Sequence, residues 1–125
     1  MAILVDTSIW VDHFRRRNAE LVQLLAEDRV WCHPLVIGEM ACGTPPQRER
    51  TLAELGLLRQ ARAATLDELM AFIDKHNLAG QGCGYVDLSL LAATRLKPGL
   101  RLWTLDRRLA TLAARLELAH FAASA

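Results

Sequence analysis

Short apolar runs alternate with longer, amphipathic segments along this chain, and that alternation most constrains its fold. Residues 2–5, 30–33 and 100–105 are too brief for helices and rich in apolar residues, so we predict a strand in each. Strands that alternate with helices favour a parallel sheet covered on both faces. A length of 125 residues suits one domain. The sequence therefore predicts a single α/β domain over residues 1–125.

Seven segments carry helical spacing or capping residues. They are residues 9–14, 20–27, 34–42, 47–55, 66–73, 86–96 and 106–116. Gly43 and Gly56 are expected to end the third and fourth helices. In the fifth, the spacing of Leu66, Leu69, Met70 and Ile73 predicts one buried face. Residues 57–61 fit either a strand or a loop, and residues 118–121 are predicted to form a final edge strand.

Composition excludes several classes of protein. No apolar run approaches the ~18 residues of a membrane helix, so no membrane partner is expected. The N-terminus lacks the positive region and cleavage site of a signal peptide, and we therefore expect a cytoplasmic protein. Cys32, Cys42 and Cys83 are odd in number and widely spaced, which indicates reduced thiols that pack as small core residues. The four histidines are dispersed without metal-ligand spacing and are interpreted as structural.

Four acidic residues stand among apolar neighbours: Asp6, Glu39, Asp87 and Asp106. Asp6 and Asp106 follow predicted strands, and the carboxyl edge of an open parallel sheet is where ligands bind. The helices that carry the other two acids can lean over the same edge. We expect each acid to be partly buried, and a buried carboxylate needs a cation or another partner.

Each acid also has a structural alternative. Aspartate is a favoured N-cap, which would account for Asp6, Asp87 or Asp106 separately. Glu39 lies inside its predicted helix, where a salt bridge to a buried arginine is the alternative. Two carboxylates about 5 Å apart repel by about 3 kcal/mol at an effective dielectric constant near 20. Four together therefore favour a shared cation.

Oxygen ligands select Mg²⁺ or Mn²⁺ over zinc. Such ions typically serve phosphodiester hydrolysis, in which the metal activates a water molecule. The hydroxyls of Ser8 and Thr104 lie close in sequence to Asp6 and Asp106 and can support the ligands by hydrogen bonding, although each also fits a local turn. Thirteen of the fifteen basic residues are arginines, several of them grouped. These groups suit phosphate recognition, with solvated helix faces as the alternative.

Four segments together resemble the PIN-domain ribonucleases, and most closely the VapC-type toxins of bacterial toxin–antitoxin pairs. They are Leu4-Val-Asp-Thr-Ser-Ile-Trp10, Val36-Ile-Gly-Glu-Met40 with Gly43, Gly84-Tyr-Val-Asp-Leu-Ser-Leu-Leu-Ala92 and Leu102-Trp-Thr-Leu-Asp106. The resemblance implies a three-layer α/β/α sandwich and cleavage of RNA with Mg²⁺ or Mn²⁺. It further implies a homodimer and a cognate antitoxin that covers the active cleft.

Residue by residue, Asp6, Glu39, Asp87 and Asp106 match the acidic quartet of that family, as catalytic and metal-binding residues. Ser8 and Thr104 match its supporting hydroxyls. The chain departs from the pattern after the last acid, where many members carry an aromatic residue and this chain has Arg107-Arg108-Leu109. Those basic residues are candidates for contact with the RNA backbone.

Two other classes remain as alternatives. A phospho-receiver domain is also an α/β sheet with acids at one edge, but it requires paired acids after the first strand, and Asp6-Thr7-Ser8 lacks the pair. A PIN-like module without catalysis, which binds RNA or a protein, would be favoured by the loss of one acid. All four acids are present in this chain.

Overall fold

The computed structural model describes residues 1–122. Within them a four-stranded sheet contains β1 (Ala2–Val5), β2 (Val30–Cys32), β3 (Arg59–Gln60) and β4 (Leu100–Trp103). The helices are α1 (Thr7–Arg16), α2 (Ala19–Ala26), α3 (Pro34–Ala41), α4 (Arg48–Leu57), α5 (Leu66–Lys75), α6 (Tyr85–Leu96) and α7 (Arg107–Arg115).

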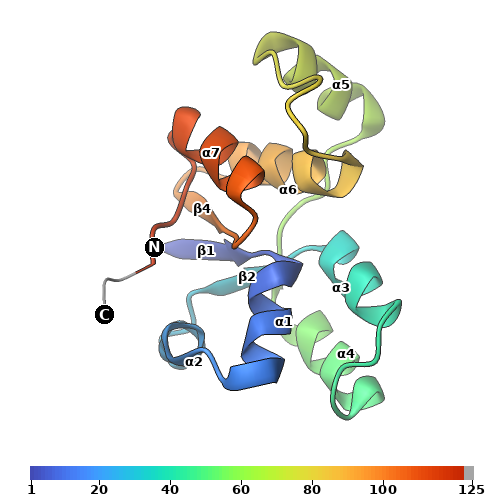
Figure 1. Ribbon diagram of the computed structural model, residues 1–125, viewed down its shortest axis with the longest axis vertical. Helices are drawn as coiled ribbons and strands as arrows, with labels where there is room; N and C mark the ends of the chain where they lie inside the picture. Colours follow the sequence, from blue (N-terminus) through green and yellow to red (C-terminus); the bar gives the residue numbers. More distant parts are fainter. Residues whose placement is uncertain (123–125) are drawn as a thin grey trace.

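The strands lie in the order β3-β2-β1-β4, and every neighbouring pair is parallel. The chain moves outward from β1 to β2 and β3, then crosses back to β4 on the other side of β1. Right-handed crossovers in opposite directions place their helices on opposite faces. Accordingly, α1 to α4 lie on one side of β1 in Figure 1 and α5 to α7 on the other. The predicted α/β/α fold with a parallel sheet is confirmed.

The core is built on β1 and α6. Ile3, Leu4 and Val5 of β1 have no exposed surface, since helices cover both faces of the central strand. Leu90 and Leu91 of α6 are equally buried. Because α6 is packed on nearly all sides, its first turn has a fixed position relative to the end of β1.

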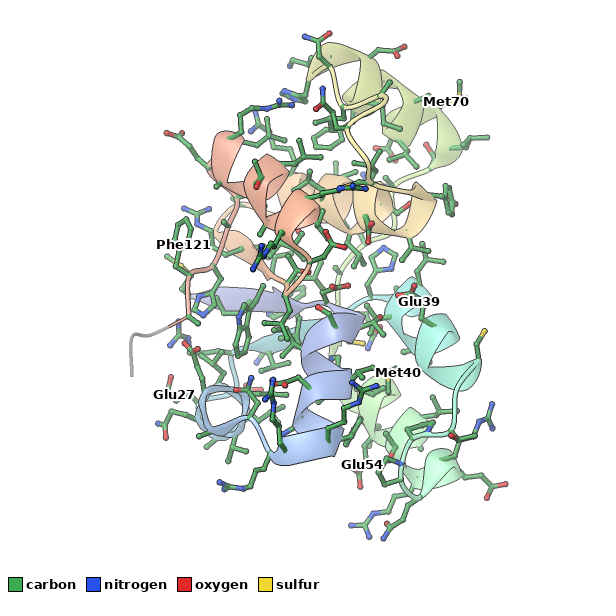
Figure 2. The ribbon with its side chains drawn as sticks, in the orientation of Figure 1. Glu27, Glu39, Met40, Glu54, Met70 and Phe121 are labelled. Carbon is green, nitrogen blue, oxygen red and sulfur yellow. The ribbon has the colours of Figure 1, made fainter. Side chains whose placement is uncertain are left out.

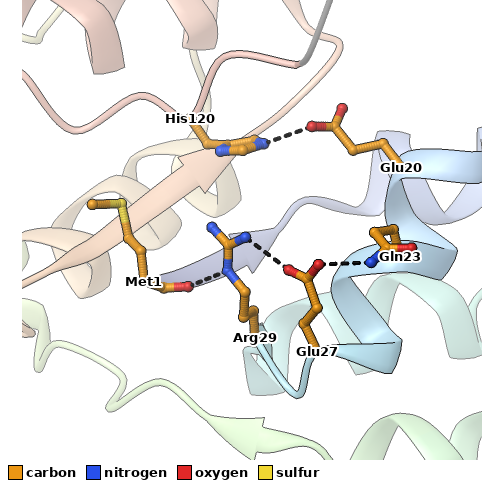
Figure 3. Close-up of polar contacts among 6 residues, drawn as sticks. All are labelled: Met1, Glu20, Gln23, Glu27, Arg29 and His120. Atoms are coloured by element: carbon orange, nitrogen blue, oxygen red, sulfur yellow. Dashed lines mark hydrogen bonds and ion pairs between the residues drawn. The ribbon is translucent and has the colours of Figure 1, made fainter.

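Polar contacts of Arg29 and of His120 tie together segments that are distant in sequence (Figure 3). Arg29 donates from Nε to the carbonyl oxygen of Met1 at 2.8 Å and from Nη1 to Glu27 at 2.9 Å. Nε2 of His120 lies 3.3 Å from a carboxylate oxygen of Glu20 on α2. These contacts join the start of β1 and the segment after α7 to the α2–β2 region.

Two of the predicted elements differ from the structure, and one segment that was left open is settled by it. Gly56 does not end its helix but lies inside α4, which continues to Leu57. The predicted strand at residues 118–121 is reduced to a single parallel bridge between Leu102 and Ala119. Residues 57–61, left open between strand and loop, contain the two-residue strand β3, which lengthens the ladder beside β2.

Side-chain placement also departs from prediction on α5. Leu69 is buried, but Leu66 and Met70 are 62% and 55% exposed, and Figure 2 shows Met70 on the outer side of the helix. The helix turns Leu69, Phe72 and Ile73 toward the core instead.

No helix within residues 1–122 has both the length and the apolar character needed to span a bilayer.

The cysteines are only partly as expected. All three are free thiols, but only Cys32 is buried, and Cys42 is exposed.

Candidate active site

Asp6 is the most buried of the four candidate acids, with 5% of its surface exposed. It follows β1, and its main-chain N–H donates to the carbonyl oxygen of Trp103 at 2.9 Å, which extends the ladder by one residue. Although Asp6 precedes α1, its side chain makes no capping hydrogen bond. The N-cap alternative is therefore wrong for Asp6.

Two hydroxyls hold one oxygen of Asp6. Ser8 Oγ and Thr104 Oγ1 each donate to Oδ2 at 2.7 Å. Thr104 follows β4, the neighbour of β1 at the point where the strand order reverses, and such a point is where open parallel sheets bind ligands. Thr104 thus meets Asp6 across 98 residues of sequence, whereas Ser8 lies two residues from it.

These hydroxyls form two short hydrogen-bonded chains. The main-chain N–H of Leu105 donates to Ser8 Oγ at 2.9 Å, and that of Asp106 donates to Thr104 Oγ1 at 3.0 Å. Each hydroxyl has one hydrogen, and in both residues it is donated to Asp6. The 3.3 Å approach between Ser8 Oγ and Thr104 Oγ1 is therefore a close contact and not a further hydrogen bond. Linked donors polarise one another, and both chains end on the same carboxylate oxygen.

Asp106 is exposed, and its Oδ1 accepts the main-chain N–H of Leu109 at 2.9 Å. The capping alternative is therefore right for this residue, which begins α7. Its second oxygen has no partner among residues 1–122. Partial burial was expected of Asp106 and is wrong, because the chain after Trp103 leaves the sheet toward solvent.

Glu39 is also exposed, contrary to the expected partial burial. Figure 2 shows it projecting from α3 toward the side on which α6 lies, while Met40 points toward α1. Its Oε1 accepts the hydroxyl of Thr7 at 2.6 Å, and no arginine pairs with it among the described residues. Thr7 begins α1 directly after Asp6, so this bond joins α3 to the end of β1.

Asp87 lies half-buried in the first turn of α6, where Oδ2 accepts the N–H of Gly84 at 3.4 Å. Burial raises its pKa most, the bond from Gly84 opposes that rise, and the negative charges of Asp6, Asp106 and Glu39 raise the pKa further. The charges of the other three acids therefore all act on Asp87 at the carboxyl edge of the sheet.

The four carboxylates share one arrangement. Each uses one oxygen to accept a hydroxyl or main-chain N–H and keeps the other without a protein partner inside residues 1–122. None takes part in an ion pair within that range, whereas acids elsewhere, such as Asp12 and Asp28, do. Oxygen donors that lack a counter-ion suit a hard divalent cation.

The present side-chain positions are more open than a closed metal site. No three histidine, cysteine or acidic side chains among residues 1–122 are close enough together to hold one ion. The donors fit Mg²⁺ or Mn²⁺ by their chemistry and by their place at one edge of the sheet, but not yet by their spacing. Ligation by three or more of them requires their side chains to move inward.

Two grooves flank α1 and open beside this edge. One, of about 470 Å³, runs from Thr7 and Glu39 past Val11 and Phe14 to Pro45. The second, of about 480 Å³, starts at Ser8 and Leu105 and passes Asp12. Val11 and Arg15 line both grooves. An extended ligand can therefore reach the acids along either side of α1.

Sequence reasoning did not single out two residues that the structure brings to the site. One is Thr7, because nothing in the sequence indicates that its hydroxyl bonds to Glu39. The other is Cys83, which was predicted to lie in the core but is only partly buried. Burial raises the pKa of its thiol, and the nearby carboxylates of Asp87 and Asp106 raise that pKa further. Only the position of Cys83 four residues before Asp87 could have indicated this.

Comparison with known proteins agrees with the fold and the arrangement of acids. The model of the PIN domain family matches residues 3–115, and the chain belongs to that family. It is 47% identical over 107 residues to Ribonuclease VapC32 of two Mycobacterium tuberculosis strains, covering 86% of each chain. Among solved structures, PAE2754 from Pyrobaculum aerophilum aligns with a TM-score of 0.58 and 19% identity, covering 94% of this chain and 96% of that one, and so shares the fold.

Proposed function

We propose that this protein is a divalent-metal-dependent endoribonuclease and the toxin of a type II toxin–antitoxin pair. One observation carries the proposal most strongly. Asp6 is a buried carboxylate that receives two hydroxyl hydrogen bonds on one oxygen, has no cation partner in residues 1–122, and shares a sheet edge with three further acids. The 47% identity to a protein named as a ribonuclease supports the same conclusion.

Asp6 and Asp87 would be the primary ligands of Mg²⁺ or Mn²⁺, with Glu39 and Asp106 completing the set. When bound, such an ion supplies charge neutralisation at the phosphate and an acidified water for hydrolysis. The hydroxyls of Ser8 and Thr104 fix Oδ2 of Asp6, so that its other oxygen keeps one direction. The hydroxyl of Thr7 does the same for Glu39.

The partners follow from the same proposal. RNA is the substrate, and a cognate antitoxin would block the cleft. The 470 Å³ groove suits a segment of such a protein, because the apolar side chains of Val11, Phe14 and Met40 line it together with the cationic Arg15. A homodimer and a cytoplasmic location remain predictions of the resemblance and of the sequence.

The test is cleavage of labelled RNA over a Mg²⁺ titration, with Asp6→Asn as the key variant. We expect the wild-type chain to cleave and Asp6→Asn to lose at least about a hundredfold in rate, because the amide removes the charge of the central ligand. Asp28→Asn is the matched control, since Asp28 is paired with Arg59 away from the acids. Wild-type rates in Asp6→Asn would contradict the proposal, and RNA binding without any cleavage would favour the non-catalytic module.

A further inference from the structure

A groove of about 230 Å³ on the outer face of α7 is rich in positive charge. It is lined by Gln81, Arg107, Arg108, Thr111, Leu112 and Arg115. Arg107, Thr111 and Arg115 are spaced by four residues, so they lie on one face of the helix. Leu109 and Ala113 face the core and fix the rotation of that helix.

The side chain of Arg108 is held against the loop before α6. A Cβ at Gly82 would lie 2.6 Å from Cδ, 2.9 Å from Nη1 and 3.0 Å from Nε of Arg108. Gly82 also has a φ of +87°, which L side chains rarely adopt. Glycine at this position therefore leaves the room that the Arg108 side chain occupies.

This placement brings Arg108 close to the candidate active site. Gly82 is followed by Cys83 and by Gly84, whose N–H bonds to Asp87. The positive charge of Arg108 acts on the Cys83 thiol, as do the negative charges of Asp87 and Asp106. Arg108 contacts this loop at Gly82, Asp87 contacts it at Gly84, and the charge of Asp106 acts on it at Cys83.

The guanidinium groups in this groove have few protein partners. Five other arginines pair with carboxylates, namely Arg16, Arg29, Arg50, Arg59 and Arg62. Within residues 1–122, Arg107 and Arg108 form no such pair, and Arg115 donates from Nη2 to the carbonyl oxygen of His76 at 3.2 Å. Exposed, unpaired guanidinium groups next to a site for phosphodiester chemistry are suited to bidentate contact with phosphate oxygens.

We propose that Arg108, together with Arg107 and Arg115 of α7, binds phosphates of single-stranded RNA and leads the strand to the acids. This inference rests on the proposed nuclease function, for which it specifies the substrate path. Arg107 and Arg115 are eight residues apart, a rise of about 12 Å along the helix, so the groove can contact more than one phosphate. Contacts from arginines to phosphate oxygens carry no sequence information, so this path should add affinity for RNA of any sequence.

Binding of a labelled 12-nucleotide RNA by the full-length chain in EDTA, followed by fluorescence anisotropy, tests the proposal without cleavage. Arg108→Ala should weaken binding about tenfold near 0.1 M salt. It should also reduce the slope of log affinity against log salt by about 0.7, the value for one phosphate contact on a single strand. Arg50→Ala, which removes a guanidinium that is paired with Glu54 on α4, should change neither quantity. Equal affinity and slope in Arg108→Ala and the wild type would overturn the proposal.

Gly82→Ala separates the position of Arg108 from its charge. It should reproduce the loss seen in Arg108→Ala and add nothing when the two changes are combined, since both act through one side chain. An additive loss in the double variant would contradict the assigned role of Gly82. If Gly82→Ala fails to fold, Arg108→Lys provides the second test: the lysine should keep the salt slope but bind RNA less tightly than arginine.

The two proposals fail in different ways. A wild-type chain that binds RNA through Arg108 but cleaves none with Mg²⁺ would refute the nuclease and retain the RNA path. A chain that cleaves with Mg²⁺ while Arg108→Ala keeps its affinity, salt slope and KM would refute the path and retain the nuclease.

Discussion

Thr104→Val should lower the stability of the metal-free protein by about 2 kcal/mol. Valine keeps the shape of threonine but removes the hydroxyl that donates to Asp6 at 2.7 Å and accepts from Asp106 N–H at 3.0 Å. A hydrogen bond to a charged group contributes about 1.5–3 kcal/mol, and the Asp6 carboxylate is nearly fully buried. The exposed N–H of Asp106 can donate to water instead of Thr104, so the loss of that hydrogen bond adds little to the destabilisation.

Urea denaturation in EDTA measures this change in the free energy of unfolding. In a thermal denaturation, about 2 kcal/mol corresponds to a fall of roughly 8 °C in Tm for a chain of this size. Thr94→Val is the matched control, because the Thr94 hydroxyl is buried but donates to the neutral carbonyl of Leu90. Its loss should be about 1 kcal/mol. Thr104→Ser should retain most of the stability. A loss below about 0.5 kcal/mol in Thr104→Val, or an equal loss in Thr104→Ser, would refute the assigned role of the hydroxyl.

Two further predictions concern titration. Burial lowers the pKa of His33, so the neutral form is favoured in the fold. The free energy of unfolding should therefore fall as pH drops below the ordinary pKa of 6.5. The difference in that free energy between pH 7 and pH 5 should be smaller in His33→Asn, whose side chain can still accept the N–H of Leu35. Glu39→Gln should lower the pKa of Asp87, because it removes one of the negative charges that raise that pKa. NMR of the Asp87 carboxyl group in metal-free buffer measures the change, and an unchanged pKa would place Glu39 outside the site.

The strands near the centre of the sheet could be predicted because burial on two faces leaves a plain apolar run. Residues 2–5 are predicted and observed as β1, and residues 30–33 shorten only by His33, which caps α3 with its ring nitrogen. β3 could not be predicted with certainty, since Arg59 and Gln60 are exposed and become a strand only by pairing with β2. Local composition does not encode such pairing.

The site was predictable in its members more than in its contacts. Asp6 and Asp106 were indicated by their places after predicted strands, and Thr104 by its place two residues before Asp106. The parallel register of β1 with β4 brings Thr104 to Asp6. The burial of Glu39 and Asp106 was wrongly predicted from apolar sequence neighbours. Glu39 lies where α3 passes the carboxyl edge, so its neighbours Val36 and Met40 turn inward while the carboxylate faces solvent. Helix rotation, set by tertiary packing, decides this.

The central claim is that the acids at the carboxyl edge bind one kind of hard divalent ion together. A titration with Mn²⁺ followed by electron paramagnetic resonance tests this claim directly, because the sharp signal of free Mn²⁺ disappears when the ion binds to the protein. The account predicts saturable binding by the wild-type chain that is abolished in Asp6→Asn and Asp87→Asn and unchanged in Asp28→Asn. Absence of saturable binding in the wild type, or equal binding in Asp6→Asn, would contradict it.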